Sequence, residues 1–290
     1  MPKTRIGGWE ISYTETGGGS PLVYIHGGFG GLGSALGPAG SPLREAVRVT
    51  FEGFGLIEYD RRNCGQSEMR SAPYDQDDIA DETADLLGQL GVKEAVIVGD
   101  SMGGTIAQSL ALAHPEMVSA LALAETSAHM KDAPFYQPMT EMVELAAREG
   151  SDAVFERRRE AIYSPQPPPL RRPGVTDGDR RETQERLDGQ VRAVHEAPEE
   201  QVKAIALGEL CNWRAHAGFD TRDRLGELAE HRVFVLHGDA DSVVPTEHGV
   251  ELANGISGAE LVLIPGGDHG ILMWPKAREA LRSWVEAEVG

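Results

Sequence analysis

A glycine-flanked serine between an apolar strand and a helix constrains this chain more than any other feature. Residues 96–98 are apolar and β-branched, the pattern Gly-x-Ser-x-Gly centred on Ser101 follows at once, and residues 105–114 are typical of a helix. A serine in such a strand–turn–helix has unfavourable backbone angles, and side chains at Gly99 or Gly103 would collide with the strand or the helix. The pattern predicts a sharp turn that exposes the Ser101 hydroxyl above a sheet.

Composition excludes several classes of partner. The chain has 290 residues and a formal net charge of −19, which argues against nucleic acid or an anionic membrane as the main partner. The two cysteines, Cys64 and Cys211, form no disulfide framework and fit a reducing compartment. The first residues lack the apolar core of a signal peptide, and no apolar run approaches the ~20 residues of a membrane span. We expect a soluble, cytoplasmic protein.

Strand-like and helix-like segments alternate along most of the chain, which is typical of a mostly parallel sheet covered on both faces. The predicted strands are residues 3–6, 9–14, 22–25, 55–59, 95–98, 118–124, 232–236 and 260–264. The predicted helices between and after them include residues 77–90, 247–256 and 276–289. We therefore assign one α/β core to residues 1–128 and 219–290.

Residues 129–218 interrupt this alternation and contain no convincing strand. The segment offers four helices, at residues 139–148, 153–163, 180–195 and 199–215. The proline-rich stretch 165–169 separates the second helix from the third. An independent second domain is the alternative, but the position between successive core strands favours a helical cap inserted into the α/β core.

Two further polar residues follow predicted strands. Asp241 lies in the loop after residues 232–236, and His269 lies in the loop after residues 260–264. Both loops leave the carboxyl ends of their strands, the edge at which open α/β sheets bind ligands and at which Ser101 is also expected. A serine hydroxyl needs a base and the base needs an orienting acid, so Ser101, His269 and Asp241 are a candidate catalytic set.

These motifs make the chain similar to α/β-hydrolase-fold serine hydrolases of the esterase and lactonase type, over residues 20–128 and 218–285. The resemblance implies that Ser101 is the nucleophile, His269 the general base and then acid, and Asp241 the residue that orients the imidazole. Asp239 fits the family pattern Gly-x-x-Asp-x-x-Val-Pro less well than Asp241 does. Glu125, at the end of the strand after the serine, is the alternative acid.

The resemblance also assigns the donors that would stabilise an oxyanion. One donor is the backbone N–H of Met102, directly after the serine. The other is the N–H of Gly28, in the glycine-rich loop after residues 22–25, and Phe29 is the alternative to Gly28. A phosphate-binding loop is disfavoured, because this loop lacks the Lys-Ser/Thr pair of a P-loop. The segment 60–67 is similar to a family segment that braces loops under the site, so Cys64 within it is expected to pack.

A serine nucleophile makes acyl transfer to water the natural reaction. We predict hydrolysis of carboxylic esters or lactones of small to medium acyl substrates under the cap. No cofactor is implied, and no histidine has metal-ligand spacing. Apolar residues that could line the substrate pocket are Phe29, Met102, Phe135, Tyr136 and Trp213.

Three other functions are compatible with the same motifs. A proline iminopeptidase-like aminopeptidase typically has tryptophan after the serine, where this chain has Met102. Hydrolases that cleave carbon–carbon bonds usually have tryptophan after the histidine, where this chain has Gly270. A ligand receptor with a hydrolase fold is the third, and the intact catalytic set argues against it.

Overall fold

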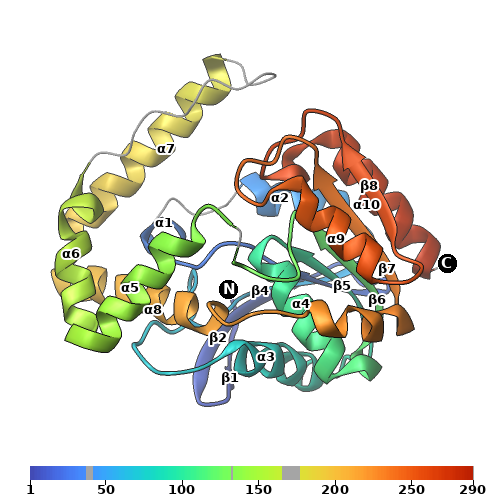
Figure 1. Cartoon of the computed structure of the whole chain (residues 1–290), viewed down its shortest axis with the longest axis horizontal. Helices are drawn as coiled ribbons and strands as arrows, with labels where there is room; N and C mark the ends of the chain where they lie inside the picture. Colours follow the sequence, from blue (N-terminus) through green and yellow to red (C-terminus); the bar gives the residue numbers. More distant parts are fainter. Residues whose placement is uncertain (37–41, 132, 165–176, 290) are drawn as a thin grey trace.

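A computed structural model describes residues 1–36, 42–131, 133–164 and 177–289. These residues form one eight-stranded sheet in the order β1-β2-β4-β3-β5-β6-β7-β8 (Figure 1). β1 and β2 pair antiparallel with their neighbours, and all other neighbouring strands are parallel. The strands are β1 (Lys3–Ile6), β2 (Trp9–Thr16), β3 (Pro21–Ile25), β4 (Gly55–Asp60), β5 (Ala95–Asp100), β6 (Val118–Ala124), β7 (Arg232–Gly238) and β8 (Glu260–Ile264).

The sheet has an apolar core on each face, because successive side chains of a strand point to opposite sides. In β5, Ile97 packs with α3, α4 and α9 on one face, while Val96 and Val98 pack with α2 and α10 on the other. These helices are α2 (Pro42–Thr50), α3 (Gln76–Gln89), α4 (Met102–Ala113), α9 (Thr246–Gly255) and α10 (Pro275–Val289). The predicted mostly parallel sheet with helices on both faces is confirmed.

Short helices complete the core. They are α1 (Leu32–Leu36) and the 3₁₀ helices η1 (Pro115–Met117), η2 (Arg222–Glu230) and η3 (Ile271–Met273). Neither α1 nor α2 was predicted from the sequence. α2 is nine residues long, and only Val47 and Thr50 in it are buried.

Four helices form an insertion between β6 and β7: α5 (Tyr136–Glu149), α6 (Ser151–Tyr163), α7 (Asp177–Glu196) and α8 (Glu199–His216). They gather on the left of Figure 1, and α7 extends away from the sheet. α6, α7 and α8 share an apolar cluster of their own that includes Phe155, Val194 and Leu210. All four predicted helices are present, and the predicted linker 165–169 lies outside the described residues.

The parallel register brings four loops to one edge of the sheet. Asp100 at the end of β5 pairs with Ala124 of β6, Ala124 pairs with Leu236 of β7, and Gly238 pairs with Ile264 of β8. The loops that follow these strands therefore emerge side by side, as expected for the carboxyl edge of a parallel sheet.

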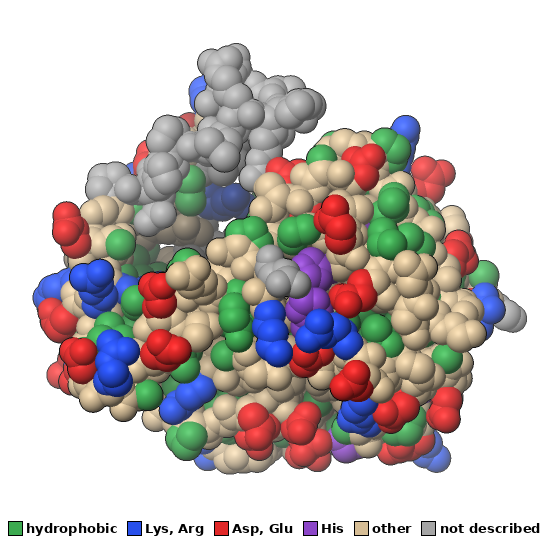
Figure 2. Space-filling view, in the orientation of Figure 1, with side chains coloured by type: hydrophobic (Ala, Val, Ile, Leu, Met, Phe, Trp, Pro, Cys, Tyr) green, Lys and Arg blue, Asp and Glu red, His purple; other side chains and the backbone are tan. Residues whose placement is uncertain are grey.

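The surface mixes charges of both signs. Acidic and basic side chains are interspersed over the face shown in Figure 2, although acidic residues outnumber basic ones in the whole chain, 46 to 27. None of the helices in the described part of the chain has the length and apolar character that crossing a bilayer requires.

Candidate active site

Ser101 lies in a strained turn between β5 and α4, the elbow (residues 99–103). Its φ of 51° and ψ of −118° fall outside the regions that residues with a side chain normally adopt. The flanking glycines make this turn possible: a Cβ on Gly99 would lie 2.6 Å from the Gly103 carbonyl oxygen, and a Cβ on Gly103 would lie 2.0 Å from the Ile25 carbonyl oxygen. Both contacts are with backbone, which cannot move aside.

The carboxyl-edge loops bring three polar side chains into a chain of hydrogen-bond contacts. Ser101 Oγ lies 3.1 Å from His269 Nε2. On the other side of the ring, His269 Nδ1 lies 2.9 Å from Asp241 Oδ2 and 3.2 Å from Oδ1. These three residues were predicted to meet here, and the distances are those a nucleophile, a base and an orienting acid need.

Asp241 is held as a carboxylate by its surroundings. Its Oδ1 accepts the N–H groups of Val243 and Val244, each at 2.8 Å. Desolvation opposes ionisation, but contacts with His237 and His269 outweigh it and lower the pKa of Asp241 below its ordinary value. Asp241 is therefore ionised at neutral pH and favours the His269 tautomer with a proton on Nδ1.

Glu125, the alternative acid, occupies a different position. Its Oε2 lies 3.7 Å from His269 Nδ1, farther than Asp241, and accepts the N–H groups of Gly270 at 2.6 Å and Ile271 at 2.7 Å. Burial, reinforced by the nearby charge of Asp100, raises the pKa of Glu125 well above its ordinary value. The geometry favours Asp241 as the partner of the imidazole and gives Glu125 the task of fixing the loop that carries His269.

Sequence reasoning missed the buried partner of Glu125. Asp100 and Glu125 are hydrogen-bonded to one another, burial raises the pKa of Asp100 as well, and Tyr24 donates its hydroxyl to Asp100 Oδ2 at 3.1 Å. Two buried carboxyl groups in contact cannot both ionise cheaply, so the pair favours sharing one proton. Its only sequence signal is the position of Asp100 directly before Ser101.

The glycine-rich loop after β3 lies against the serine. A Cβ on Gly27 would lie 2.9 Å from Ser101 Cβ, so only glycine lets the loop approach this closely. Arg61 is fully buried and donates to the Gly28 carbonyl oxygen at 2.5 Å, which fixes the loop from below. His26 Nδ1 lies 2.8 Å from the Gly27 carbonyl oxygen and adds to this bracing.

The segment 60–67 supports the loop and carries no second nucleophile. Asn63 has φ 57°, in a left-handed region that asparagine tolerates, and its amide donates to the Tyr74 hydroxyl at 3.0 Å. Cys64 is fully buried, and burial raises the pKa of its thiol to about 11. A reactive cysteine needs a thiolate, so Cys64 packs rather than reacts.

Asp239 also has a structural partner. Its Oδ1 accepts the Gly266 N–H at 2.6 Å, which joins the loops after β7 and β8. Asp239 is thus bound to the Gly266 backbone, whereas Asp241, two residues later, is the carboxylate that contacts His269.

A cavity of about 1130 Å³ opens above Ser101. Three of the predicted pocket residues, Phe29, Met102 and Phe135, line it, together with Met130, Val243 and Val244. Gly28 and His269 also face it, and α7 contributes Arg186 and Gln190.

Two predicted pocket residues are placed elsewhere. Tyr136 donates its hydroxyl to the Ala217 carbonyl oxygen at 3.3 Å, and Trp213 lies under the Arg158 guanidinium, 4.5 Å from the ring centre. Neither lines the cavity above Ser101. Both residues instead pack within the insertion or at its junction with the core.

Among the described residues, two groups of side chains have the donor types and spacing to hold a metal ion. One comprises Asp241 and His269 of the candidate catalytic set together with Glu125. The other comprises His129, His248 and Glu251, which the sequence analysis did not connect. The only local sequence signal for the second group was the spacing His248-x-x-Glu251 on a predicted helix.

The chain is similar to known proteins over nearly its whole length. A putative non-heme chloroperoxidase of Synechocystis is 28% identical over 272 residues, which cover 90% of this chain and 89% of that protein. A 2-hydroxy-6-oxo-6-phenylhexa-2,4-dienoate hydrolase of Comamonas testosteroni is 26% identical, covering 95% of this chain and 90% of that protein. The solved structure of an esterase from Thermogutta terrifontis superposes with a TM-score of 0.68 at 26% identity, covering 99% and 97% of the two chains.

The family comparison covers most of the chain. The model of the alpha/beta hydrolase fold matches residues 20–276, a range that includes the elbow, both downstream loops and the insertion. The protein belongs to the alpha/beta hydrolase fold family.

Proposed function

We propose that this protein hydrolyses carboxylic esters or lactones through an acyl-enzyme on Ser101. The observation that carries the proposal is the continuous contact from Ser101 Oγ through His269 to Asp241, at 3.1 Å and 2.9 Å, at the floor of a large cavity. An esterase is also among its structural relatives.

The chemistry follows from the positions of the protons. His269 Nε2 accepts the Ser101 proton while Oγ attacks the substrate carbonyl carbon, and Asp241 stabilises the imidazolium that forms. The imidazolium then gives its proton to the departing alcohol oxygen. In the second half-reaction His269 takes a proton from water, which attacks the acyl group and releases the acid and the serine.

The oxyanion of each tetrahedral intermediate needs hydrogen-bond donors. We assign this role to the backbone N–H groups of Met102 and Gly28, with Phe29 as the alternative to Gly28. The close approach of the glycine loop to Ser101 and the buried Arg61 beneath it support the assignment. Donors fixed in advance are worth about 10²–10³ in rate for each one.

We assign the insertion, residues 129–218, the role of a cap that selects the acyl group. Phe135 at the start of α5 and Arg186 and Gln190 of α7 line the cavity, so the insertion contributes to its walls. Apolar side chains near the nucleophile favour small to medium acyl groups.

Hydrolysis of short-chain p-nitrophenyl esters by the purified protein tests the proposal. We expect wild-type turnover, and a loss of about 10⁶-fold in kcat for Ser101→Ala. Ser109→Ala is the matched control, because it removes a buried hydroxyl from α4, the helix that follows Ser101, away from the cavity. Full activity of Ser101→Ala would refute the mechanism. If the wild type turns over no ester, lactone, aminoacyl-arylamide or 2-hydroxy-6-oxo-6-phenylhexa-2,4-dienoate, the result favours a ligand receptor.

Cleavage of a carbon–carbon bond by the same three residues is the second candidate. It is favoured by the Comamonas dienoate hydrolase, which matches 95% of this chain, and disfavoured by Gly270 in the position where such enzymes usually have tryptophan. Assaying 2-hydroxy-6-oxo-6-phenylhexa-2,4-dienoate beside the esters separates the two. A kcat/KM for the dienoate far above that for every ester would replace the ester proposal.

A further inference from the structure

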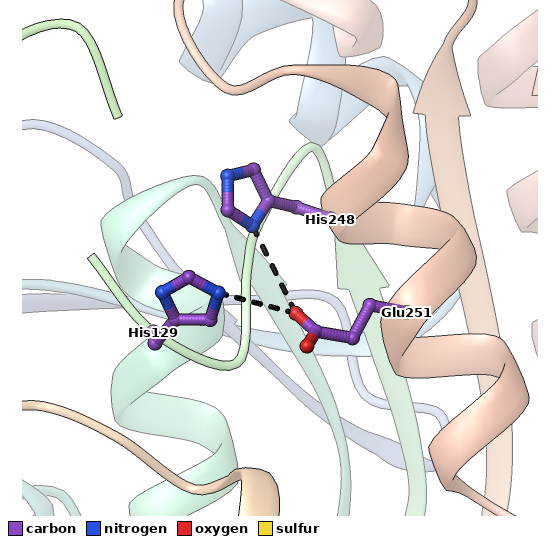
Figure 3. Close-up of side chains that lie close together, drawn as sticks. All are labelled: His129, His248 and Glu251. Atoms are coloured by element: carbon purple, nitrogen blue, oxygen red, sulfur yellow. Dashed lines mark ion pairs between the residues drawn. The ribbon is translucent and has the colours of Figure 1, made fainter. Parts of the chain in front are cut away.

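A second cluster of histidines and a carboxylate lies away from Ser101. His129 comes from the segment after β6, and His248 and Glu251 come from one face of α9 (Figure 3). His129 Nε2 lies 3.3 Å from Glu251 Oε2, and His248 Nδ1 lies 4.0 Å from the same oxygen. The three donor atoms all lie within 4.8 Å of one another.

The cluster is built into the fold rather than formed by mobile surface side chains. His129 is 3% exposed and His248 is 6% exposed, and their rings pack edge to face with centroids 5.0 Å apart. Glu251 is 38% exposed at the side-chain level, so its carboxylate borders solvent. Two imidazoles are therefore fixed in advance, and the third donor can adjust its position.

We propose that His129, His248 and Glu251 form a binding site for a divalent transition-metal ion, with Zn²⁺ as the best match. Two imidazoles and one carboxylate are a donor set that zinc prefers and that Mg²⁺ and Ca²⁺ do not. Bonds of about 2.0–2.1 Å in a tetrahedral site place ligand atoms about 3.4 Å apart. The His129–Glu251 distance of 3.3 Å is already close to this value. Rotation of the partly exposed Glu251 side chain, with small shifts of the two rings, would bring the other donor pairs, all within 4.8 Å, to the same separation.

The site would join two segments that border the active-site cavity. Ser127 and Met130, on either side of His129, line the cavity, and so do Val243 and Val244, which precede α9. Val243 and Val244 also donate to Asp241. A bound ion would thus connect the first residues of the insertion to the loop that holds the catalytic acid, and would stabilise both.

Zinc titration of the chelator-treated full-length protein tests this inference by calorimetry and thermal unfolding. We expect one Zn²⁺ per chain and a rise in Tm of about 5 °C when zinc is present at a hundred times its dissociation constant. Mg²⁺ at the same concentration should leave Tm unchanged. Cobalt binding should give visible ligand-field absorption characteristic of a site with nitrogen and oxygen ligands.

Four variants locate the ion. His248→Ala and Glu251→Gln should weaken zinc binding by about 100-fold or more, because each removes one ligand. Glu251→Gln changes a half-exposed side chain and is expected to fold even if His248→Ala does not. His269→Ala should bind zinc as the wild type does, as should His114→Ala, which removes a partly exposed histidine paired with Asp81.

The outcomes are distinct. Loss of zinc binding in His269→Ala with retention in Glu251→Gln would place the ion at the catalytic residues and overturn the proposal. Wild-type protein that binds no zinc at millimolar concentration would also overturn it. Because ester hydrolysis is not the readout, the result is independent of the function proposed for Ser101.

Discussion

The sheet core and the helical insertion differ in how tightly each fixes its side chains. In the core, backbone contacts determine the site: Ser101 stands on a turn that tolerates no Cβ at Gly103, and Asp241 is held by two backbone N–H groups. The insertion packs around its own apolar cluster and sends few side chains to the cavity, among them Phe135 and Arg186.

The sheet core and the insertion therefore differ in what a substitution in each would change. The core carries the candidate chemistry and cannot change a backbone contact without losing it. The insertion contributes Phe135, Arg186 and Gln190 to the cavity wall, and under the proposed function these side chains would contact the substrate.

After the loss of Ser101 itself, the largest expected effect is at Asp241, the candidate acid of the core. Asp241→Asn should lower kcat by about 10⁴-fold, because the amide favours the wrong tautomer of His269 and cannot stabilise the imidazolium. Glu125→Gln should lower kcat by about tenfold or less, since its amide oxygen can still accept the Gly270 and Ile271 N–H groups. Ester hydrolysis measured across pH compares the two. Equal losses would mean that Glu125 shares the role of the acid.

A pair of glycine substitutions compares backbone tolerance in the two regions. Gly103→Ala should lower the free energy of unfolding by about 3 kcal/mol or more, because the new Cβ meets the Ile25 carbonyl oxygen at 2.0 Å. Gly189→Ala, inside α7, should raise it by about 1 kcal/mol, because the nearest atom is Arg192 Nη2 at 3.7 Å and alanine favours the helix. Urea unfolding measures both. A tolerated Gly103→Ala would contradict the account of the elbow.

The sequence could predict the core because its signals are local. β-branched runs mark the strands, glycines mark the elbow, and Ser101, Asp241 and His269 each follow a strand end, so the parallel register alone brings them to one edge. The strand assignments needed only small extensions, such as β5 to Asp100 and β7 to Gly238.

The remaining features depend on contacts between segments far apart in the chain. Helical periodicity identifies an apolar face but not its neighbour, so Tyr136 and Trp213 were predicted at the cavity and lie elsewhere. His129 and His248 have no motif of their own and meet only because the segment after β6 passes α9.

The stability of the junction between the sheet core and the helical insertion should depend on pH through His216. Burial, with a contribution from the Arg61 charge, lowers the pKa of His216 to about 3, and its ring contacts Phe29 of the core. The unfolded chain takes up a proton near pH 6.5 and the folded chain does not, so stability from this residue is present above pH 6.5 and is lost as pH falls.

His216→Gln removes this dependence and keeps a donor for the Asn212 carbonyl oxygen, which lies 2.9 Å from His216 Nδ1. The stability advantage of the wild type over the variant should shrink by about 2 kcal/mol between pH 7 and pH 5. Urea unfolding at the two pH values measures it. A constant difference would mean that His216 becomes protonated in the folded protein.

The smallest expected effect isolates the contribution of the insertion to specificity. Phe135 lines the cavity, and its ring meets that of Phe29 with centroids 5.7 Å apart. Phe135→Ala should lower kcat/KM for a bulky acyl ester about tenfold, through lost apolar contact, and leave an acetate ester nearly unchanged.

Tyr136→Phe is the matched control beside it, because it keeps the ring and removes only the hydroxyl that donates to Ala217. It should leave the ratio of kcat/KM values for the two esters unchanged and lower stability by about 1 kcal/mol. If Phe135→Ala instead slowed both esters equally, the insertion would be acting on the catalytic residues themselves. The separation between a core that reacts and an insertion that selects would then fail, because changes on either side would reach the same step.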